Sequence, residues 1–203
     1  MSGTHLPQNP PRIVIATGNN HKISEIRTIL FGIQGELLDL RQFPRFEEPE
    51  ENAPDYVGNA LLKARYYAHL TELPSLADDS GLEVDELDGR PGLLSARYGG
   101  AELSSRGKIE KLLEDIRQIP RARRSARFRC AVALVWPDGQ LCSADATCEG
   151  TLLEAPDATP GAFGYDPIFV PTGFTQTFSQ LPPETKHRVS HRGKALRKLF
   201  NLT

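Results

Sequence analysis

No apolar stretch in this 203-residue sequence approaches the ~20 residues that a helix needs to cross a bilayer. The longest apolar run lies around Ala131 to Trp136. The formal net charge is only −2, so no excess of positive charge attracts nucleic acid or an anionic membrane. Residues 1–11 lack a basic segment followed by an apolar one, which argues against a signal peptide. We expect no membrane contact and no stable nucleic-acid partner.

Cysteine is scarce as well, because Cys130, Cys142 and Cys148 form an odd set without CxxC spacing. This pattern favours reduced thiols packed in the core of a cytoplasmic protein over disulfides or a zinc site. The sequence also has no Ser-His-Asp ordering and no internal repeat. A disulfide scaffold, a zinc protein, a triad hydrolase and a repeat protein are all disfavoured.

The hydrophobic content of 39% is sufficient for one domain with a proper core. We assign residues 12–203 to that domain, which can have two lobes, and residues 1–11 to a flexible tail. Helical periodicity marks three segments, with apolar residues at Ile23, Ile26 and Leu30, at Val57, Ala60, Leu61, Ala64 and Ala68, and at Ile109, Leu112, Leu113, Ile116 and Ile119. Ser190 is a candidate cap for a last helix.

Strand patterns alternate with these helices. The predicted strands are 12–16, 74–77 ending at Asp78, a hairpin of 126–136 and 141–148, and a short strand at the end of the loop 161–171. Mixed helices, parallel-capable strands and a hairpin predict an α/β or α+β fold with a mixed sheet.

A loop between the first strand and helix is a candidate anion site. Backbone N–H groups and the helix dipole favour an anion there, Lys22 adds a positive charge, and Gly18 permits close approach of a ligand. The alternative is a plain turn with an asparagine cap, because the spacing is neither a P-loop nor a dinucleotide fingerprint. The loop consists of Thr17, Gly18, Asn19, Asn20, His21 and Lys22.

Asp78 and Asp79 are adjacent carboxylates, a pattern typical of a magnesium site that also uses water and phosphate oxygens. Neighbouring side chains on a strand point to opposite sides, so one carboxylate would face the ligand and the other would support it. A solvated Asx turn is the alternative. A further metal carboxylate could come from the acidic loop with Glu47, Glu48, Glu50 and Glu51, although such acids are more often simply solvated.

Two later segments could recognise a nucleotide base. In the first, Phe163 or Tyr165 could stack on the base next to Gly164, with Asp166 as an acceptor, and the alternative is that the aromatic is core. The second provides donors from Lys186, Ser190, His191 and Arg192, which suit either phosphate oxygens or the carbonyl edge of a base, although His191 by itself is more often a structural residue. Residues 121–129 are rich in arginine, and we interpret them as a solvated linker and exposed strand face rather than a nucleic-acid patch.

Six motifs in sequence order resemble the inosine triphosphate pyrophosphatase family, the dITP/XTP diphosphatases. They are TGNNHK (17–22), NALLKA (59–64), LADDSGLEVDEL (76–87), PGLLSARY (91–98), GAFGYDPIF (161–169) and SHRGKAL (190–196). The resemblance covers residues 12–199. It departs at Gly58, where the family commonly has glutamate.

The resemblance implies Mg²⁺-dependent hydrolysis of ITP, dITP and XTP to the monophosphate and pyrophosphate, an elongated mixed sheet with two lobes around the substrate cleft, and a homodimer. It implies that Asp79 is the catalytic proton acceptor and a metal ligand, with Glu50 or Glu51 as the second. Residues 17–22 would hold the triphosphate, Ser80 would touch the substrate, and residues 163–166, Lys186, His191 and Arg192 would bind chiefly the base. The alternatives are a Maf-type pyrophosphatase for other nucleotides and a non-catalytic nucleotide-binding module.

Overall fold

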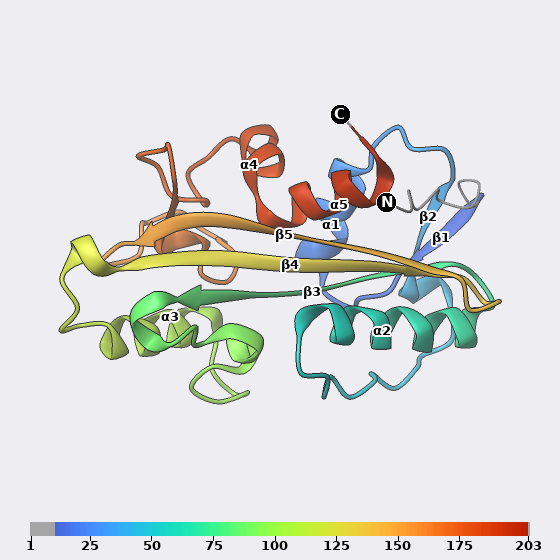
Figure 1. The fold of residues 1–203 in the computed structure, drawn as a ribbon, viewed down its shortest axis with the longest axis horizontal. Helices are drawn as coiled ribbons and strands as arrows, with labels where there is room; N and C mark the ends of the chain where they lie inside the picture. The colour runs from blue at the N-terminus through green and yellow to red at the C-terminus, as the bar shows by residue number, and fades with distance from the viewer. Residues whose placement is uncertain (1–10, 203) are drawn as a thin grey trace, which may run out of the picture. The chain divides into compact units, whose positions relative to one another are not determined.

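The structure, a computed structural model, describes residues 11–202, so the predicted tail 1–11 lies outside the described residues apart from Pro11. Its sheet has six strands in the order β2-β1-β3-β4-β5-β6 (Figure 1). β1 pairs in parallel with β2 and β3, whereas β5 pairs antiparallel with β6. This confirms an α/β fold with a mixed sheet flanked by helices. The strands are β1 Arg12–Ile15, β2 Glu36–Asp39, β3 Ser75–Val84, β4 Ser125–Val135, β5 Leu141–Leu152 and β6 Phe169–Pro171.

The predicted amphipathic helices are present. Asn19, Asp55 and Ser104 cap the first three, because each side chain accepts a hydrogen bond from a backbone N–H of the first turn. Ser190 is extended and directly precedes the last helix, as predicted for a cap position. The helices are α1 Asn20–Ile29, α2 Tyr56–Thr71, α3 Ser105–Asp115, α4 Pro183–Val189 and α5 His191–Phe200.

The chain divides into two compact units, and each has its own apolar core. Unit 1 comprises Met1–Asp79, Cys130–Ala146 and Arg192–Thr203. Within it, α1 and α5 lie on one side of the strands and α2 lies on the other (Figure 1). Strand and helix side chains of its core include Ile13, Ile15, Ile23, Ile26, Leu30, Val132, Leu134, Leu196 and Leu199.

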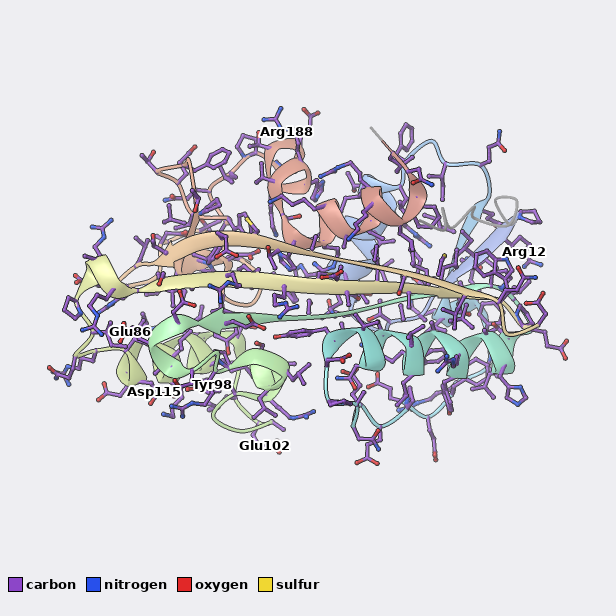
Figure 2. All side chains as sticks on the ribbon, viewed as in Figure 1. Arg12, Glu86, Tyr98, Glu102, Asp115 and Arg188 are labelled. Carbon is purple, nitrogen blue, oxygen red and sulfur yellow. The ribbon has the colours of Figure 1, made fainter. Side chains whose placement is uncertain are left out.

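Unit 2 comprises Ser80–Arg129 and Thr147–His191. At its surface the Tyr98 hydroxyl donates to Asp115 Oδ2 at 2.6 Å (Figure 2). Gly150 on β5 is tightly enclosed, since a Cβ there would lie 2.4 Å from the Val170 carbonyl oxygen. The core of this unit includes Leu82, Val84, Ile109, Leu112, Ile116, Phe128, Leu152, Tyr165, Ile168, Phe169 and Phe178.

The prediction that the second strand ends at Asp78 is wrong, because β3 continues to Val84. The reason is that β1 pairs with β3 only at Ser75 and Leu76, whereas β3 has β4 as its other neighbour. The two acids therefore lie past the end of β1 and within their own strand. β2 and α4 were not predicted from the sequence, and α3 ends at Asp115, before the predicted helical positions Ile116 and Ile119.

The predicted hairpin of β4 and β5 is confirmed. Trp136 N–H donates to the Gln140 carbonyl at 2.9 Å and Leu152 N–H donates to the Arg124 carbonyl at 3.0 Å, which joins the strands near both ends. All three cysteines are buried, as predicted. Among residues 11–202, no helix is long and apolar enough to span a membrane.

Candidate active site

The predicted anion loop joins β1 to α1 in unit 1. The Asn19 side-chain oxygen accepts hydrogen bonds from the backbone N–H of His21 at 3.0 Å and of Lys22 at 3.3 Å. Thr17 Oγ1 accepts from the Asn19 N–H at 3.2 Å, and Asn20 is exposed at the first turn. The backbone N–H groups of His21 and Lys22, which could otherwise donate to an anion, thus bond to the capping Asn19 side chain. This agrees with the alternative prediction of a plain turn with an asparagine cap. The charge at this loop comes from Lys22.

Asp78 is the centre of a buried ion network in unit 1. Its Oδ2 lies 3.1 Å from Lys22 Nζ and 2.9 Å from Arg192 Nη2. Arg192 also pairs through Nη1 with Glu25. The side chains of Asp78 and Arg192 are only 1% and 4% exposed. Two carboxylates and two cations therefore balance one another at a site where Asp78 and Arg192 are buried and Lys22 and Glu25 are partly buried.

The electrostatics of this network fix the protonation of Asp78. Burial alone would raise its pKa, but Lys22, Arg192 and Lys63 outweigh burial and hold the pKa of Asp78 well below its usual range. Burial, together with the charge of Asp78, raises the pKa of the Cys130 thiol to about 12. Asp78 is therefore an ionised support for Lys22 and Arg192, and Cys130 is no nucleophile.

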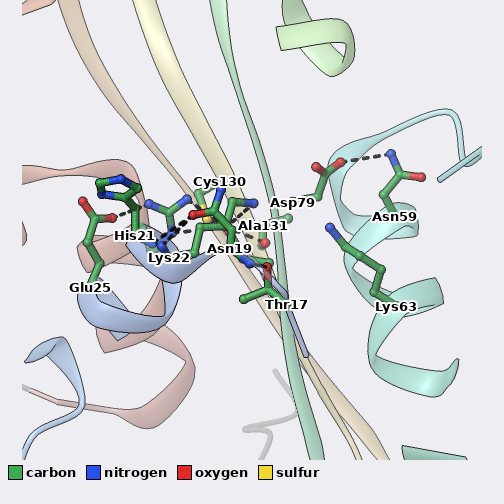
Figure 3. A network of polar contacts seen from close by, with 12 residues as sticks. Thr17, Asn19, His21, Lys22, Glu25, Asn59, Lys63, Asp79, Cys130 and Ala131 are labelled. Carbon is green, nitrogen blue, oxygen red and sulfur yellow. Dashed lines mark hydrogen bonds and ion pairs between the residues drawn. The ribbon is translucent and has the colours of Figure 1, made fainter. Parts of the chain in front are cut away.

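Asp79, the next residue, has a different environment. Asn59 Nδ2 on α2 donates to Asp79 Oδ2 at 3.0 Å (Figure 3). Burial raises the pKa of Asp79 above its ordinary value; Lys63 and the Asn59 hydrogen bond oppose that shift, and Glu51 adds to it. The two adjacent carboxylates therefore differ, since the pKa of Asp78 is lowered and that of Asp79 is raised.

Lys63 is a site residue that the sequence analysis missed. It lies on α2 four residues after Asn59, and its Nζ is 2.9 Å from Glu51 Oε1. Burial would lower its pKa, but Asp78, Glu51 and Asp79 raise the pKa of Lys63 above its usual value. The ammonium is thus a fixed positive charge on which both aspartates act, and Figure 3 shows Lys63 on the side of Asp79 and Asn59. The helical spacing of Asn59 and Lys63 within NALLKA was the signal that could have found it.

The carboxylates in unit 1 suit a hard cation. Among residues 11–202, no group of three or more His, Cys, Asp or Glu side chains is arranged to hold a metal. Asp79 and Glu51 lie close enough for the charge of Glu51 to raise the pKa of Asp79. Magnesium takes one or two protein carboxylates and completes its shell with water and phosphate oxygens. A two-carboxylate donor set therefore fits magnesium better than zinc, which prefers nitrogen and sulfur ligands.

The acidic loop before α2 separates its glutamates by environment. Glu51 is partly buried, whereas Glu47 and Glu50 are exposed. Glu48 Oε1 lies 3.5 Å from the position that a Cβ on Gly18 would take, so Glu48 packs beside the anion loop. The family resemblance pointed to Glu50 or Glu51 without choosing between them.

Gly58, the position that departs from the family pattern, lies in the first turn of α2. Its N–H donates to the capping residue Asp55 at 2.7 Å. A Cβ at Gly58 would lie 2.7 Å from the Cβ of Ala53, which is closer than such atoms approach. The next residue, Asn59, accepts through Oδ1 from the Ala53 N–H at 2.9 Å and so ties the acidic loop to the helix.

The predicted base-binding residues, apart from Arg192, lie in unit 2. Tyr165 is a core residue, which was the alternative to stacking on a base. Its ring is buried and its hydroxyl donates to the Ser95 carbonyl at 3.1 Å. Phe163 is partly exposed, which leaves it as the aromatic that a base can reach. Gly164 between them has a φ of 55°, a conformation that favours glycine. Ser80, where unit 2 begins, is partly buried on β3.

Charged and aromatic groups meet in unit 2. Lys186 Nζ on α4 lies 2.7 Å from Asp166 Oδ2 and 5.9 Å from the centre of the Phe178 ring. His191 stacks on Phe128 with ring centres 4.7 Å apart and planes at 10°. A cation, a carboxylate and a stacked imidazole are the kinds of polar group that the predicted base site requires.

The motif SHRGKAL thus serves both units, because His191 belongs to unit 2 and Arg192 to unit 1. Arg192 pairs with Asp78 and Glu25 and so belongs to the ion network of unit 1. Its predicted role in base binding stays a prediction.

The arginine-rich segment forms an ion-pair face in unit 2. Arg123 Nη2 lies 2.7 Å from Glu86 Oε2, and Arg127 Nη2 lies 2.8 Å from Asp85 Oδ1. Arg129 Nη1 is 3.6 Å from Glu83 Oε1. The prediction of a solvated linker is wrong for Arg124, which is buried and donates through Nε to the Ile119 carbonyl at 2.8 Å. Arg127 and Arg129 are partly exposed on β4 and pair with carboxylates, and the absence of nucleic-acid binding stays a prediction.

Fold and side chains together define an α/β protein with a buried carboxylate pair that suits a cation and phosphate. Comparison with known proteins agrees. The chain is 46% identical over 185 residues to a dITP/XTP pyrophosphatase of Geobacter sulfurreducens, covering 91% of this chain and 92% of that protein. It is 45% identical to a dITP/XTP pyrophosphatase of Thermus thermophilus, covering 93% and 90%.

Solved structures are also similar. A HAM1 protein from Coxiella burnetii has a TM-score of 0.84 at 34% identity, covering 94% of this chain and 97% of that one. A nucleoside-triphosphatase / dITP/XTP pyrophosphatase from Mycobacterium abscessus has a TM-score of 0.73 at 41% identity, covering 93% and 97%. Residues 13–202 match the Ham1 family. The chain belongs to this family, as the sequence motifs predicted.

Proposed function

We propose that this protein hydrolyses the non-standard purine nucleotides ITP, dITP and XTP to the nucleoside monophosphate and pyrophosphate. The names of its relatives support this activity. The observation that carries this proposal is the difference in environment between Asp78 and Asp79. Asp78 is an ionised support, whereas Asp79 has a raised pKa and sits beside a fixed ammonium and a second carboxylate. Hydrolysis of an anhydride needs such charge control more than a covalent nucleophile.

Asp79 and Glu51 would hold the magnesium ion. Glu51 is preferred over Glu50 because it is partly buried and acts on the pKa of Asp79, whereas Glu50 is exposed. The chemistry that magnesium supplies when bound is neutralisation of charge on the phosphate oxygens. Lys22 and Lys63 would add to this neutralisation, since both lie beside the aspartate pair and carry positive charge.

Asp79 would accept the proton in the reaction. A water oxygen attacks the α-phosphorus, the bond from that phosphorus to the bridging oxygen breaks, and pyrophosphate leaves with the bonding electrons. The proton released by the attacking water passes to the Asp79 carboxylate, which would act as the general base. Asn59 would orient Asp79 through the hydrogen bond to Oδ2.

The base would be recognised in unit 2 by Phe163, Asp166, Lys186 and His191. Donors that meet a 6-oxo group would be left unpaired by the amino group of adenine, at a cost of about 1–3 kcal/mol each. Arg192 would act differently, by holding Asp78 through the contacts described above. Residues 17–22, through Lys22 and the start of α1, would hold the triphosphate.

The arrangement of the two lobes around the substrate cleft, the homodimer and the cytoplasmic location stay predictions. Light scattering coupled to size-exclusion chromatography tests the homodimer directly.

The activity itself is tested by measuring pyrophosphate release from ITP, XTP, dITP, GTP, ATP and dTTP, with and without magnesium. Release from the first three that depends on magnesium is expected. Preference for dTTP would favour a Maf-type pyrophosphatase. No release from any nucleotide, despite binding of ITP, would favour a non-catalytic nucleotide-binding module and overturn the proposal.

A further inference from the structure

Asp157, a residue of unit 2 with no role so far, is the centre of a compact hydrogen-bond cluster. The hydroxyls of Thr177 and Ser179 both donate to its Oδ2, and the Thr159 N–H donates to its Oδ1 at 2.8 Å. Burial would raise the pKa of Asp157, but its hydrogen bonds to Ser179, Thr159 and Thr177 outweigh burial and lower it. The carboxylate is thus ionised and accepts three hydrogen bonds.

The cluster fixes the segment 153–168, which carries the predicted base-binding residues 163–166. Leu153 N–H donates to the Ile168 carbonyl at 2.9 Å, and Asp157 N–H donates to the Pro167 carbonyl at 2.9 Å. Backbone bonds therefore hold both ends of this segment together, and Asp157 lies at the base of the loop that leads to Phe163.

The other side of the cluster fixes Phe178, which lies between Thr177 and Ser179. Its ring stacks with Phe128 at 5.7 Å and with His191 at 6.4 Å between centres. Lys186 Nζ lies 5.9 Å from the same ring. Thr177 and Phe178 are each 1% exposed, so this side of the cluster is firmly packed.

We propose that Asp157 is a positioning residue for recognition of the base, acting through both segments without touching the nucleotide. It joins the segment that carries Phe163 and Asp166 to the segment whose Phe178 ring packs against His191 and Lys186. The inference rests on the proposed assignment of the base site to unit 2. A loosened cluster would misplace the groups that meet the base and leave Lys22, Lys63 and Asp79 of unit 1 unchanged.

The test separates base recognition from triphosphate binding. Asp157→Asn is expected to raise the KM for ITP about tenfold, the factor that corresponds to one lost charge-assisted hydrogen bond, with kcat changed less than about twofold. Inhibition by inorganic tripolyphosphate, which has no base, should stay unchanged. Glu154→Gln, at an exposed acid of the same segment, is the matched control and should leave both values unchanged.

Ser179→Ala provides a second route if Asp157→Asn does not fold. It removes one donor and should raise the KM for ITP by about threefold, and in the double variant its effect should not add to that of Asp157→Asn. Equal effects on KM and on tripolyphosphate inhibition would indicate a general structural role and overturn the inference.

Lys186→Ala distinguishes the inference from the proposed function. A raised KM for ITP in Lys186→Ala with an unchanged KM in Asp157→Asn would overturn the role of Asp157 alone. Unchanged KM in both variants would overturn the assignment of the base site to unit 2, and the role of Asp157 with it.

Discussion

Asp78→Asn should destabilise the protein strongly, whereas the same change one residue later should not. Lys22 Nζ and Arg192 Nη2 lie 3.1 Å and 2.9 Å from Asp78 Oδ2. At an effective dielectric constant of about 20 and a separation of about 3 Å, each pair contributes roughly 5 kcal/mol before desolvation. Breaking a buried network by removing one partner typically costs about 3–5 kcal/mol, because the remaining charges lose their compensation. That is a large share of a total stability of about 5–15 kcal/mol.

The stability of the protein should also fall at acidic pH because of Asp78. The pKa of Asp78 is lowered in the folded protein, so below about pH 4 the unfolded chain binds more protons than the native state. The stabilisation from Asp78 is fully present above the pKa of this residue in the unfolded chain, and it is lost as the pH falls toward its pKa in the folded protein. Protonation of Asp78 should lower the free energy of unfolding by up to about 1.4 kcal/mol per pH unit in that range. Asp78→Asn should lack this contribution.

The measurement is urea unfolding followed by fluorescence in EDTA-containing buffers across the acidic range. The single tryptophan, Trp136, packs against the core of unit 1 and therefore reports on the unit that holds Asp78. Asp79→Asn is the control, since burial raises the pKa of Asp79 and removal of its charge should leave stability unchanged or higher. Equal losses in the two variants, or a loss below about 1 kcal/mol for Asp78→Asn, would refute the argument.

Three further predictions concern turnover, the metal and packing. Asp79→Asn should keep its fold by circular dichroism but lose about 10²- to 10⁴-fold in kcat for ITP, and near-normal turnover would reject its role as proton acceptor. Glu51→Gln should raise the magnesium concentration for half-maximal activity by at least about tenfold, as expected for a lost metal ligand, and Glu50→Gln should not; equal effects would contradict the assignment of Glu51. Gly150→Ala should lower the free energy of unfolding in urea by about 1–3 kcal/mol, because the Cβ of the alanine would overlap the Val170 carbonyl oxygen. An unchanged urea midpoint would contradict this prediction and show that β6 moves away at no cost in stability.

Periodic patterns made much of the fold predictable. The apolar positions of α1, α2 and α5 repeat at helical spacing, and the hairpin of β4 and β5 is bounded by a Pro-Asp-Gly turn. α4 is only seven residues long and none of them is buried, so it has no apolar stripe to detect. The extent of β3 was not predictable from its own residues, because its length depends on β4 as a neighbour.

At the site, residue types were more predictable than their partners. The sequence indicated that one of the two aspartates would support the other, and the contacts of Asp78 agree with that division. It did not indicate Lys63 or Glu25, since a lysine or glutamate on an amphipathic helix is most often solvated. Their burial follows from tertiary contacts with residues far along the chain, which periodicity does not encode.

The close approach of Gly58 and Ala53 has a consequence for the acidic loop. A side chain at position 58 would take the space of the Ala53 methyl group, so the segment that carries Ala53 would have to move. Because the same loop carries Glu51 and is tied to α2 through Asn59, a substitution at Gly58 also shifts the acid next to Asp79. The absence of a side chain at Gly58 is therefore one condition for the present path of the loop that carries Glu51.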